Sequence, residues 1–270
     1  DTTDRDAAFI SDKPGGQSVD LQLLGKACLV TGASAGIGDG IARVLAREGV
    51  RLAITARRGE RLERLADEIE AETGGRPFIV TADLMDDDAP EVVRAAVHSA
   101  FGGLDILVNN AGLSSSLDPM MPDEAWNMHF NLKFTTVRRL TNAFMPDMRQ
   151  RGWGRIINVT GFIEPAGTSP ALAACAAVHA WAKGLSRDLA SDGITVNSVP
   201  PGRIDSEQIM KKYPEGSPAR VDLTTRQIPM GRFGAPEDLA NLVTFLASPR
   251  ADYITGTVIP VDGGMSRFAM

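Results

Sequence analysis

The sequence lacks the features that mark several large classes of protein. Its 270 residues include only two cysteines, Cys28 and Cys175, which give neither a disulfide framework nor metal-ligand spacing and are typical of a cytoplasmic protein. No run approaches the roughly 18 consecutive apolar residues of a membrane span. The 28 lysines and arginines are scattered and are outnumbered by 34 acidic residues. We therefore expect no metal, no membrane insertion and no nucleic-acid partner.

The N-terminal segment is expected to lie outside the folded core. It opens with Asp-Thr-Thr-Asp-Arg-Asp and lacks the apolar stretch of a signal peptide. We interpret residues 1–19 as a flexible or partner-docked arm. No linker-like change in composition divides residues 20–270, so this part of the chain is predicted to form one domain.

Beyond the arm, short apolar runs alternate with helical patterns. The runs are nearly continuous rather than alternating, which is typical of strands buried on both faces of a parallel sheet. Repetition of strand and helix favours right-handed crossovers and a doubly wound sheet. The sequence thus predicts an α/β fold of the Rossmann type, with a mostly seven-stranded parallel sheet and helices on both faces. The predicted strands span residues 27–31, 51–55, 78–81, 104–109, 155–159, 194–199 and 257–261.

A glycine-rich turn follows the first predicted strand and opens the first helix. Its glycines allow the backbone to approach a diphosphate closely, while the helix N-terminus presents unpaired N–H groups to the anion. Glycines of this kind can form a tight turn without a ligand, but the strand before and the helix after favour dinucleotide binding. The candidate phosphate-binding residues are Gly32, Ser34, Gly36, Ile37 and Gly38.

The end of the second predicted strand indicates which dinucleotide is bound. An acidic residue here would accept from the ribose 2′-hydroxyl of NAD, whereas this chain has Arg57 and Arg58. Two arginines favour the 2′-phosphate of NADP, although they could also form a solvated helix start. We predict NADP as the cofactor, with NAD as the alternative.

Further motifs follow along the chain. Any one of them could occur by chance, but their occurrence together in this order is specific. In these motifs, from Leu24 to Met270, the chain resembles the short-chain dehydrogenase/reductase family. They are Ala82-Asp83-Leu84, Asn109-Asn110-Ala111-Gly112, Asn131-Leu132, the run from Arg155 to Val159, the run from Gly193 to Asn197, the turn from Pro201 to Ser206, and Val261-Asp262-Gly263-Gly264.

The resemblance implies roles for residues at the carboxyl ends of the strands. Asp83 and Leu84 would line the adenine site, although Asp83 could instead cap a helix. Ile204 and Ser206 would hold the nicotinamide carboxamide. Residues 206–228 would form a lid over the substrate, and the family's habit of pairing through long helices implies a homodimer or homotetramer. The remaining cofactor-binding candidates are Asn110, Ala111 and Gly112, beside the adenosine ribose, and Pro201 and Gly202.

The proton-transfer residues of the family are largely missing. The usual set is a serine, an asparagine, and a tyrosine and lysine in Tyr-x-x-x-Lys spacing, in which the tyrosine moves a proton and the lysine lowers its pKa. Asn131 matches the asparagine, but Gly161, preceded by Thr160, stands in the serine's place. Neither of the two tyrosines lies four residues before a lysine. The substrate-pocket candidates are Thr160, Gly161, Phe162, Cys175 and Arg203, the last of which could bind an anionic group.

Two alignments of the following helix remain open. His179-x-x-x-Lys183 has the spacing of the missing motif, and a histidine suits proton transfer near neutral pH. An ungapped alignment instead puts Ala171 in the tyrosine's place and Cys175 in the lysine's. In the first alignment His179 and Lys183 are catalytic; in the second they are ordinary helix residues.

Three functions are compatible with this pattern. The first is an NAD(P)-dependent oxidoreductase that transfers hydride between nicotinamide and a carbonyl or secondary alcohol, with a non-standard proton donor. The second is a cofactor-binding sensor or partner subunit with little turnover. The third is a lyase or isomerase that uses the same pocket. An intact dinucleotide motif favours the first two.

Overall fold

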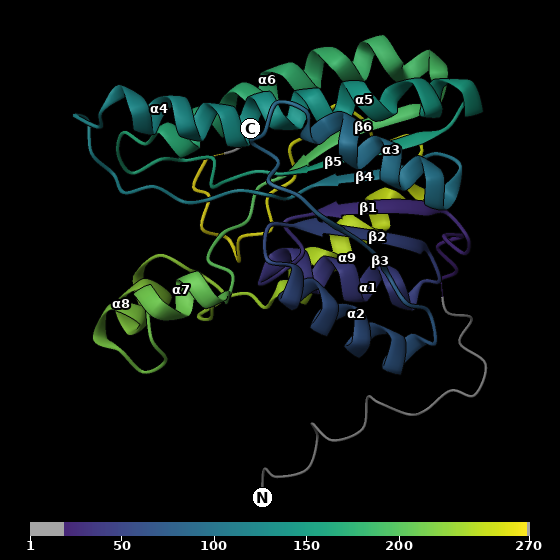
Figure 1. Cartoon of the computed structure of the whole chain (residues 1–270). Helices are drawn as coiled ribbons and strands as arrows, with labels where there is room; N and C mark the ends of the chain where they lie inside the picture. Colours follow the sequence, from purple (N-terminus) through teal and green to yellow (C-terminus); the bar gives the residue numbers. More distant parts are fainter. Residues whose placement is uncertain (1–18, 269–270) are drawn as a thin grey trace, which may run out of the picture.

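The computed structural model describes residues 19–268, the side chain at position 208 excepted. Almost all of the predicted arm, residues 1–18, lies outside the described residues. The described helices and strands alternate from the start, as Figure 1 shows. The strands are β1 (Ala27–Thr31), β2 (Arg51–Ala56), β3 (Phe78–Thr81), β4 (Ile106–Asn109), β5 (Gly154–Val159) and β6 (Ile194–Val199). The α-helices are α1 (Ile37–Arg47), α2 (Gly59–Thr73), α3 (Ala89–Phe101), α4 (Asp123–Phe130), α5 (Thr136–Arg151), α6 (Pro170–Leu189), α7 (Glu207–Lys212), α8 (Pro218–Arg226) and α9 (Pro236–Ala247).

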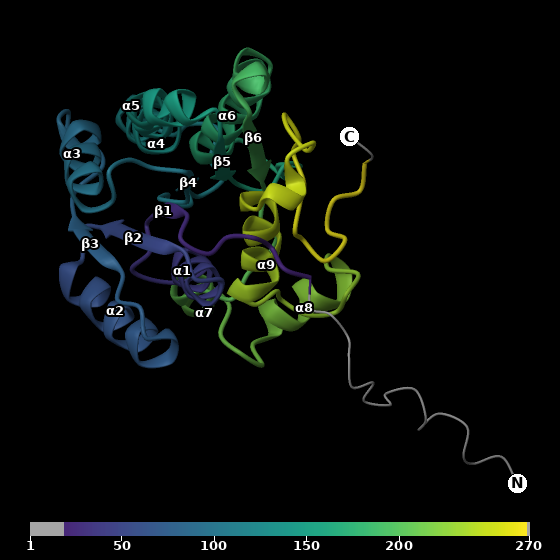
Figure 2. The ribbon, with the colours of Figure 1, turned by 90° about the vertical axis from the view of Figure 1, so that its right-hand side faces the viewer.

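The strands form one parallel sheet in the order β3-β2-β1-β4-β5-β6. Every residue of β1, β4 and β6 is buried, because helices cover both faces. Figure 2 shows α1, α2 and α9 on one face and α3, α5 and α6 on the other. The predicted fold class is confirmed. The direction in which successive strands are added to the sheet reverses between β1 and β4. Open α/β sheets bind ligands in the crevice beside such a reversal, at the carboxyl ends of the strands.

The predicted seventh strand is not a continuous strand, so the described sheet has six strands rather than seven. Val258 and Val261 form isolated parallel bridges to Ser198 and Pro201. Pro200 and Pro201 lack the N–H groups that a ladder needs, and the pairing is therefore interrupted after β6. The segment still lies beside β6, since the Ser198 N–H donates to the Thr257 carbonyl at 2.9 Å.

The long helix around Asn131 is interrupted by a single π turn. α4 runs into a π-helical segment, η1 (Asn131–Thr135), which continues directly into α5. Such turns are rare and occur often at functional sites. This turn lies at the crevice end of the helix, between β4 and α6. No helix within residues 19–268 is long and apolar enough to cross a membrane.

Candidate active site

The turn between β1 and α1 leaves no room for side chains at its glycines. Gly32 and Gly36 have φ values of +67° and +61°, which favour glycine. A Cβ on Gly38 would lie 2.4 Å from the Gly32 carbonyl oxygen, and one on Gly36 would lie 2.9 Å from the Ser206 Cβ. No side chain caps the first N–H groups of α1, which begins at Ile37. These groups and the helix dipole suit an anion, so the turn fits a dinucleotide's diphosphate.

Hydrogen bonds join the end of β4 to this turn. The Thr31 hydroxyl oxygen accepts hydrogen bonds from the N–H groups of Asn110 at 2.9 Å and Ala111 at 3.0 Å. The Asn110 side-chain amide donates in turn to the Thr31 carbonyl oxygen at 2.9 Å. A Cβ on Gly32 would lie 2.8 Å from the Ala111 Cα. The two predicted cofactor segments are therefore adjacent and mutually held in place.

Arg58 lies beside the glycine turn, as a 2′-phosphate site requires. Its guanidinium donates to the Ser34 hydroxyl oxygen through Nε at 3.2 Å and Nη2 at 2.9 Å. About half of the Arg58 side chain remains exposed, leaving donors for a ligand. Arg57 points toward Asp83, with 3.7 Å between Nη1 and Oδ2. Ser34, Arg57 and Arg58 thus form a basic, hydroxyl-bearing edge at the end of β2.

Asp83 is not a helix cap in this structure. The N-cap of α3 is Asp88, whereas Asp83 Oδ1 accepts from the Met85 N–H at 3.1 Å. The adjacent Leu84 is buried, and its carbonyl oxygen accepts from the Thr136 hydroxyl at 3.0 Å. Asp83 and Leu84 therefore form a fixed wall at the end of β3.

The turn after β6 brings residues 206–228, the predicted lid, close to the glycine-rich turn. Gly202 passes so close to the C-terminal segment that a Cβ would lie 2.6 Å from the Asp262 Cα. Ile204 is buried and bridges to Gly234. Ser206 caps α7, its hydroxyl oxygen accepting from the Ile209 N–H at 3.3 Å, and it faces Gly36. The predicted turn and the glycine-rich turn therefore line opposite sides of the same crevice.

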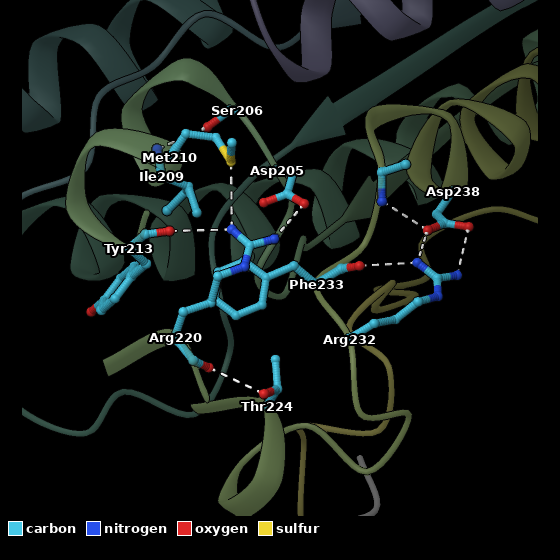
Figure 3. A network of polar contacts seen from close by, with 11 residues as sticks. Asp205, Ser206, Ile209, Met210, Tyr213, Arg220, Thr224, Arg232, Phe233 and Asp238 are labelled. Carbon is cyan, nitrogen blue, oxygen red and sulfur yellow. Dashed lines mark hydrogen bonds and ion pairs between the residues drawn. The ribbon is translucent and has the colours of Figure 1, made fainter. Parts of the chain in front are cut away.

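A network around Arg220 holds the lid helices α7 and α8 together (Figure 3). The Arg220 guanidinium donates to Asp205 Oδ2 at 2.7 Å and to the Tyr213 carbonyl oxygen at 3.2 Å. It also stacks on Phe233, with 4.1 Å from the guanidinium carbon to the ring centroid. The predicted pocket residue Arg203 faces Tyr213, at 5.7 Å from its ring centroid. One largely buried guanidinium therefore links α8 to the end of α7 and to the turn after β6.

Thr160 and His179 meet at the wall of the crevice. Thr160 Oγ1 and His179 Nε2 are 2.8 Å apart, joining the end of β5 to α6. Thr160 is buried, and His179 is half-buried. Removal from water disfavours the imidazolium and lowers the pKa of His179 below its ordinary 6.5. A hydroxyl and a neutral imidazole therefore form a hydrogen-bonded pair that can pass a proton.

An apolar cavity of about 250 Å³ adjoins this pair. The absence of a side chain at Gly161 leaves space beside Leu172 and Cys175. A Cβ at this position would lie 3.0 Å from Leu172 Cδ2 and 3.2 Å from Cys175 Sγ. Phe162 also packs against the apolar cluster beneath the lid. The cavity can receive an apolar part of a substrate beside His179. Its lining includes Trp126, Gly161, Phe162, Leu172, Cys175 and His179.

Lys183 does not join this group. The Lys183 ammonium donates to the Gly256 carbonyl oxygen at 3.1 Å and lines neither crevice cavity among the described residues. The His-Lys pairing by spacing is therefore not a pairing in space. Asn131 begins the π turn and is half-buried.

Sequence reasoning missed Lys133. Its Nζ would lie 2.7 Å from a Cβ on Gly112, and it lines one small pocket together with Cys175 and Thr160. A lysine two positions after Asn131 falls on another face of a regular helix, so its spacing gave no signal. Burial raises the pKa of the Cys175 thiol, and Lys133 opposes that shift without overcoming it. Cys175 is therefore a neutral thiol.

Glu164 faces the C-terminal segment rather than the crevice. Its carboxylate accepts hydrogen bonds from the N–H groups of Arg267 and Phe268, at 2.8 and 2.9 Å. No three His, Cys, Asp or Glu side chains within residues 19–268 converge as a metal site would require.

Comparison with known proteins places this crevice among dinucleotide-dependent reductases. A family model described as enoyl-(acyl carrier protein) reductase matches residues 32–266. The 3-oxoacyl-[acyl-carrier-protein] reductase of Vibrio cholerae is 39% identical over 249 residues, 91% of this chain and 99% of that protein. The corresponding Staphylococcus aureus protein is 41% identical and covers 89% of this chain and 98% of its own length.

Solved structures extend the likeness to cofactor complexes. The L-sorbose reductase of Gluconobacter frateurii, complexed with NADPH and L-sorbose, has a TM-score of 0.88 at 33% identity, covering 93% of this chain and 100% of that one. The RhlG/NADP active-site complex of Pseudomonas aeruginosa has a TM-score of 0.83 at 33% identity, covering 91% and 98%.

Proposed function

The chain belongs to the short-chain dehydrogenase/reductase family, and from this premise we propose that it reduces a small-molecule carbonyl with NADPH, the proton passing through Thr160 and His179. The observation that carries the proposal is the 2.8 Å contact between Thr160 Oγ1 and His179 Nε2 beside the apolar cavity. Because this chain lacks the tyrosine motif, the proposed proton donor is a relay formed by Thr160 and His179 at another part of the crevice wall.

The crevice residues suit NADP(H) along its length. The N–H groups at the start of α1 would bind the diphosphate, and Ser34 with Arg58 would bind the 2′-phosphate. When bound, the nicotinamide supplies hydride to the carbonyl carbon. The other residues proposed to contact the cofactor are Arg57, Asp83, Leu84, Asn110, Ala111, Gly112, Pro201, Gly202, Ile204 and Ser206.

The relay delivers one proton for each carbonyl reduced. As negative charge develops on the substrate oxygen, the Thr160 hydroxyl donates its proton to that oxygen. Thr160 is reprotonated by Nε2–H of the His179 imidazolium, leaving a neutral imidazole that recovers a proton from solvent. Because burial lowers the pKa of His179, the imidazolium is the scarcer form at neutral pH. Asn131 would orient the substrate or a water molecule at the same end of the crevice.

The cavity indicates the kind of carbonyl compound that fits. Its walls near the relay include Trp126, Phe162 and Leu172, which favour an apolar substituent on the carbonyl carbon. A screening panel should contain a 3-oxoacyl thioester and L-sorbose, for which the relatives are named. It should also contain simple aliphatic and aromatic ketones.

The test is NADPH oxidation across this panel by the wild type and by Thr160→Val. We expect turnover by the wild type and a loss of about 100-fold in kcat for Thr160→Val, the size expected of a proton-transfer group. Thr244→Val on α9 is the matched control, because its buried hydroxyl has no hydrogen-bond partner among the described residues. NADPH binding without turnover by the wild type would contradict the reductase function and favour a cofactor-binding sensor or partner subunit.

A further inference from the structure

We infer that the Lys133 ammonium is the cation of this active site, binding the ribose hydroxyls at the nicotinamide end and stabilising charge on the substrate oxygen. The inference rests on the proposed function and assigns a role there to a residue outside the relay. Lys133 extends from the π turn η1 toward the ends of β4 and β5.

The Lys133 tip lies beside the ends of β4 and β5. A Cβ on Gly112, just after β4, would be 2.7 Å from Nζ, so the ammonium lies close to the Gly112 backbone. Lys133, Cys175 and Thr160 line one small pocket. The ammonium therefore lies between the end of β4 and the proton relay.

The charge of Lys133 lacks a protein counterion. No carboxylate within residues 19–268 lies at ion-pair distance from it, whereas Arg43, Arg47 and Arg76 on the surface all have acidic partners. The neighbouring Cys175 is a neutral thiol, since burial raises that pKa. A partly buried ammonium is costly unless oxygen atoms replace its water. Ribose hydroxyls and a developing oxyanion are such oxygen donors.

The neighbouring cations do not reach this position. Lys183 is held by the Gly256 carbonyl oxygen, and Arg203 faces Tyr213. Among the residues lining the pocket shared with Thr160, Lys133 is the only cation. A preorganised ammonium in such a site stabilises transition-state charge at little reorganisation cost.

Binding experiments test the ribose contact without requiring turnover. NADPH and 2′,5′-ADP would be titrated into the wild type, Lys133→Met and Lys133→Arg. We expect Lys133→Met to bind NADPH about tenfold more weakly, as expected for one charged hydrogen bond. It should bind 2′,5′-ADP, which lacks the nicotinamide half, as the wild type does, and Lys133→Arg should retain most of the NADPH affinity. Unchanged NADPH affinity, or equal weakening for both ligands, would overturn the inference.

Moving the lysine across the pocket tests the catalytic contribution. Because residues 133 and 175 line the same small pocket, Cys175→Lys would restore an ammonium to that pocket from α6. We expect Lys133→Met to lose about 100-fold in kcat, and Lys133→Met combined with Cys175→Lys to recover at least about tenfold of it. Lys26→Met is the control and should keep kcat close to the wild type, because the Lys26 ammonium lies 4.1 Å from the Trp153 ring centroid, at the amino end of β1.

The two proposals can fail separately. If the wild type binds NADPH but reduces no carbonyl, the proposed function fails, while the NADPH and 2′,5′-ADP titrations still decide the ribose contact. If the wild type turns over and Lys133→Met retains kcat within about threefold, the catalytic role of Lys133 fails and the Thr160–His179 relay stands. Should the double variant not fold, the comparison of Lys133→Met with Lys133→Arg gives the decision.

Discussion

At the residue scale, the proposed substitute for the proton chemistry of a missing tyrosine is a hydroxyl and an imidazole from two different elements. Thr160 follows β5, and His179 lies one turn after Cys175 on α6. The sequence identified both residues but paired His179 with Lys183 through their spacing. Lys183 lies one turn further along α6, and its ammonium is bound to the Gly256 carbonyl oxygen. Only folding could show that the partner of His179 comes from a strand end.

The relay predicts a characteristic dependence on pH. The pKa of His179 is lowered by burial, so its imidazolium forms only as the pH falls below about 6.5. We expect kcat for carbonyl reduction to rise as the pH falls through that lowered pKa, because the imidazolium returns a proton to the Thr160 oxygen. His179→Gln preserves a hydrogen-bonding group but cannot titrate, and its kcat should be lower and flat over the same range.

The second buried histidine provides the control for this profile. Burial also lowers the pKa of His129, on α4, aided by the nearby Lys133 charge. His129→Gln should keep the wild-type pH dependence of kcat. A His179→Gln profile that still rose toward acid, or a His129→Gln profile that became flat, would show that His179 does not supply the proton.

At the element scale, the crevice is made from strand ends, and these were largely predictable. The boundaries of β1, β3 and β6 coincide with the predicted strands, and every residue of β1 and β6 is buried. The seventh strand was overpredicted, since an apolar run alone does not reveal that Pro200 and Pro201 interrupt its partner. The π turn at Asn131–Thr135 has no comparable signal, and Lys133 was missed for the same reason.

The order of the predicted lid is expected to depend on the contacts of Arg220. Arg220 joins Asp205, the Tyr213 carbonyl oxygen and Phe233, and its side chain is only 15% exposed. We expect Arg220→Met to increase hydrogen exchange across α7 and α8 by about tenfold or more, because charged hydrogen bonds are lost. The KM for the carbonyl substrate should rise with it. Exchange in β1 and β4 should stay unchanged, and it can be followed by mass spectrometry.

Arg226→Met on the same helix is the matched control. Arg226 pairs with Asp222 at 2.8 Å, but its side chain is 78% exposed, so the pair should contribute little. Equal exchange rates in the two variants would mean that the Arg220 network does not order the lid.

At the scale of the whole molecule, the site residues follow the ends of all six described strands. The glycine-rich turn and Arg58 lie at the β1 and β2 end, and Thr160 and Lys133 lie at the β5 end. The fold class followed from the order of strands, helices and glycines, which also predicts where the cofactor binds. The contact on which the proposed proton donor depends forms between elements that are distant in sequence. The homodimer or homotetramer expected from the family stays a prediction, as do the individual cofactor contacts.

Calorimetric titration of the wild type with NADPH and NADH tests the central claim most directly. We expect one NADPH per chain, bound at least about tenfold more tightly than NADH, because charged hydrogen bonds from Arg58 favour the 2′-phosphate. Arg58→Ala should abolish most of that preference while leaving NADH affinity unchanged. The absence of binding heat with either nucleotide, or equal affinities for both, would contradict an NADPH-dependent reductase built on this crevice.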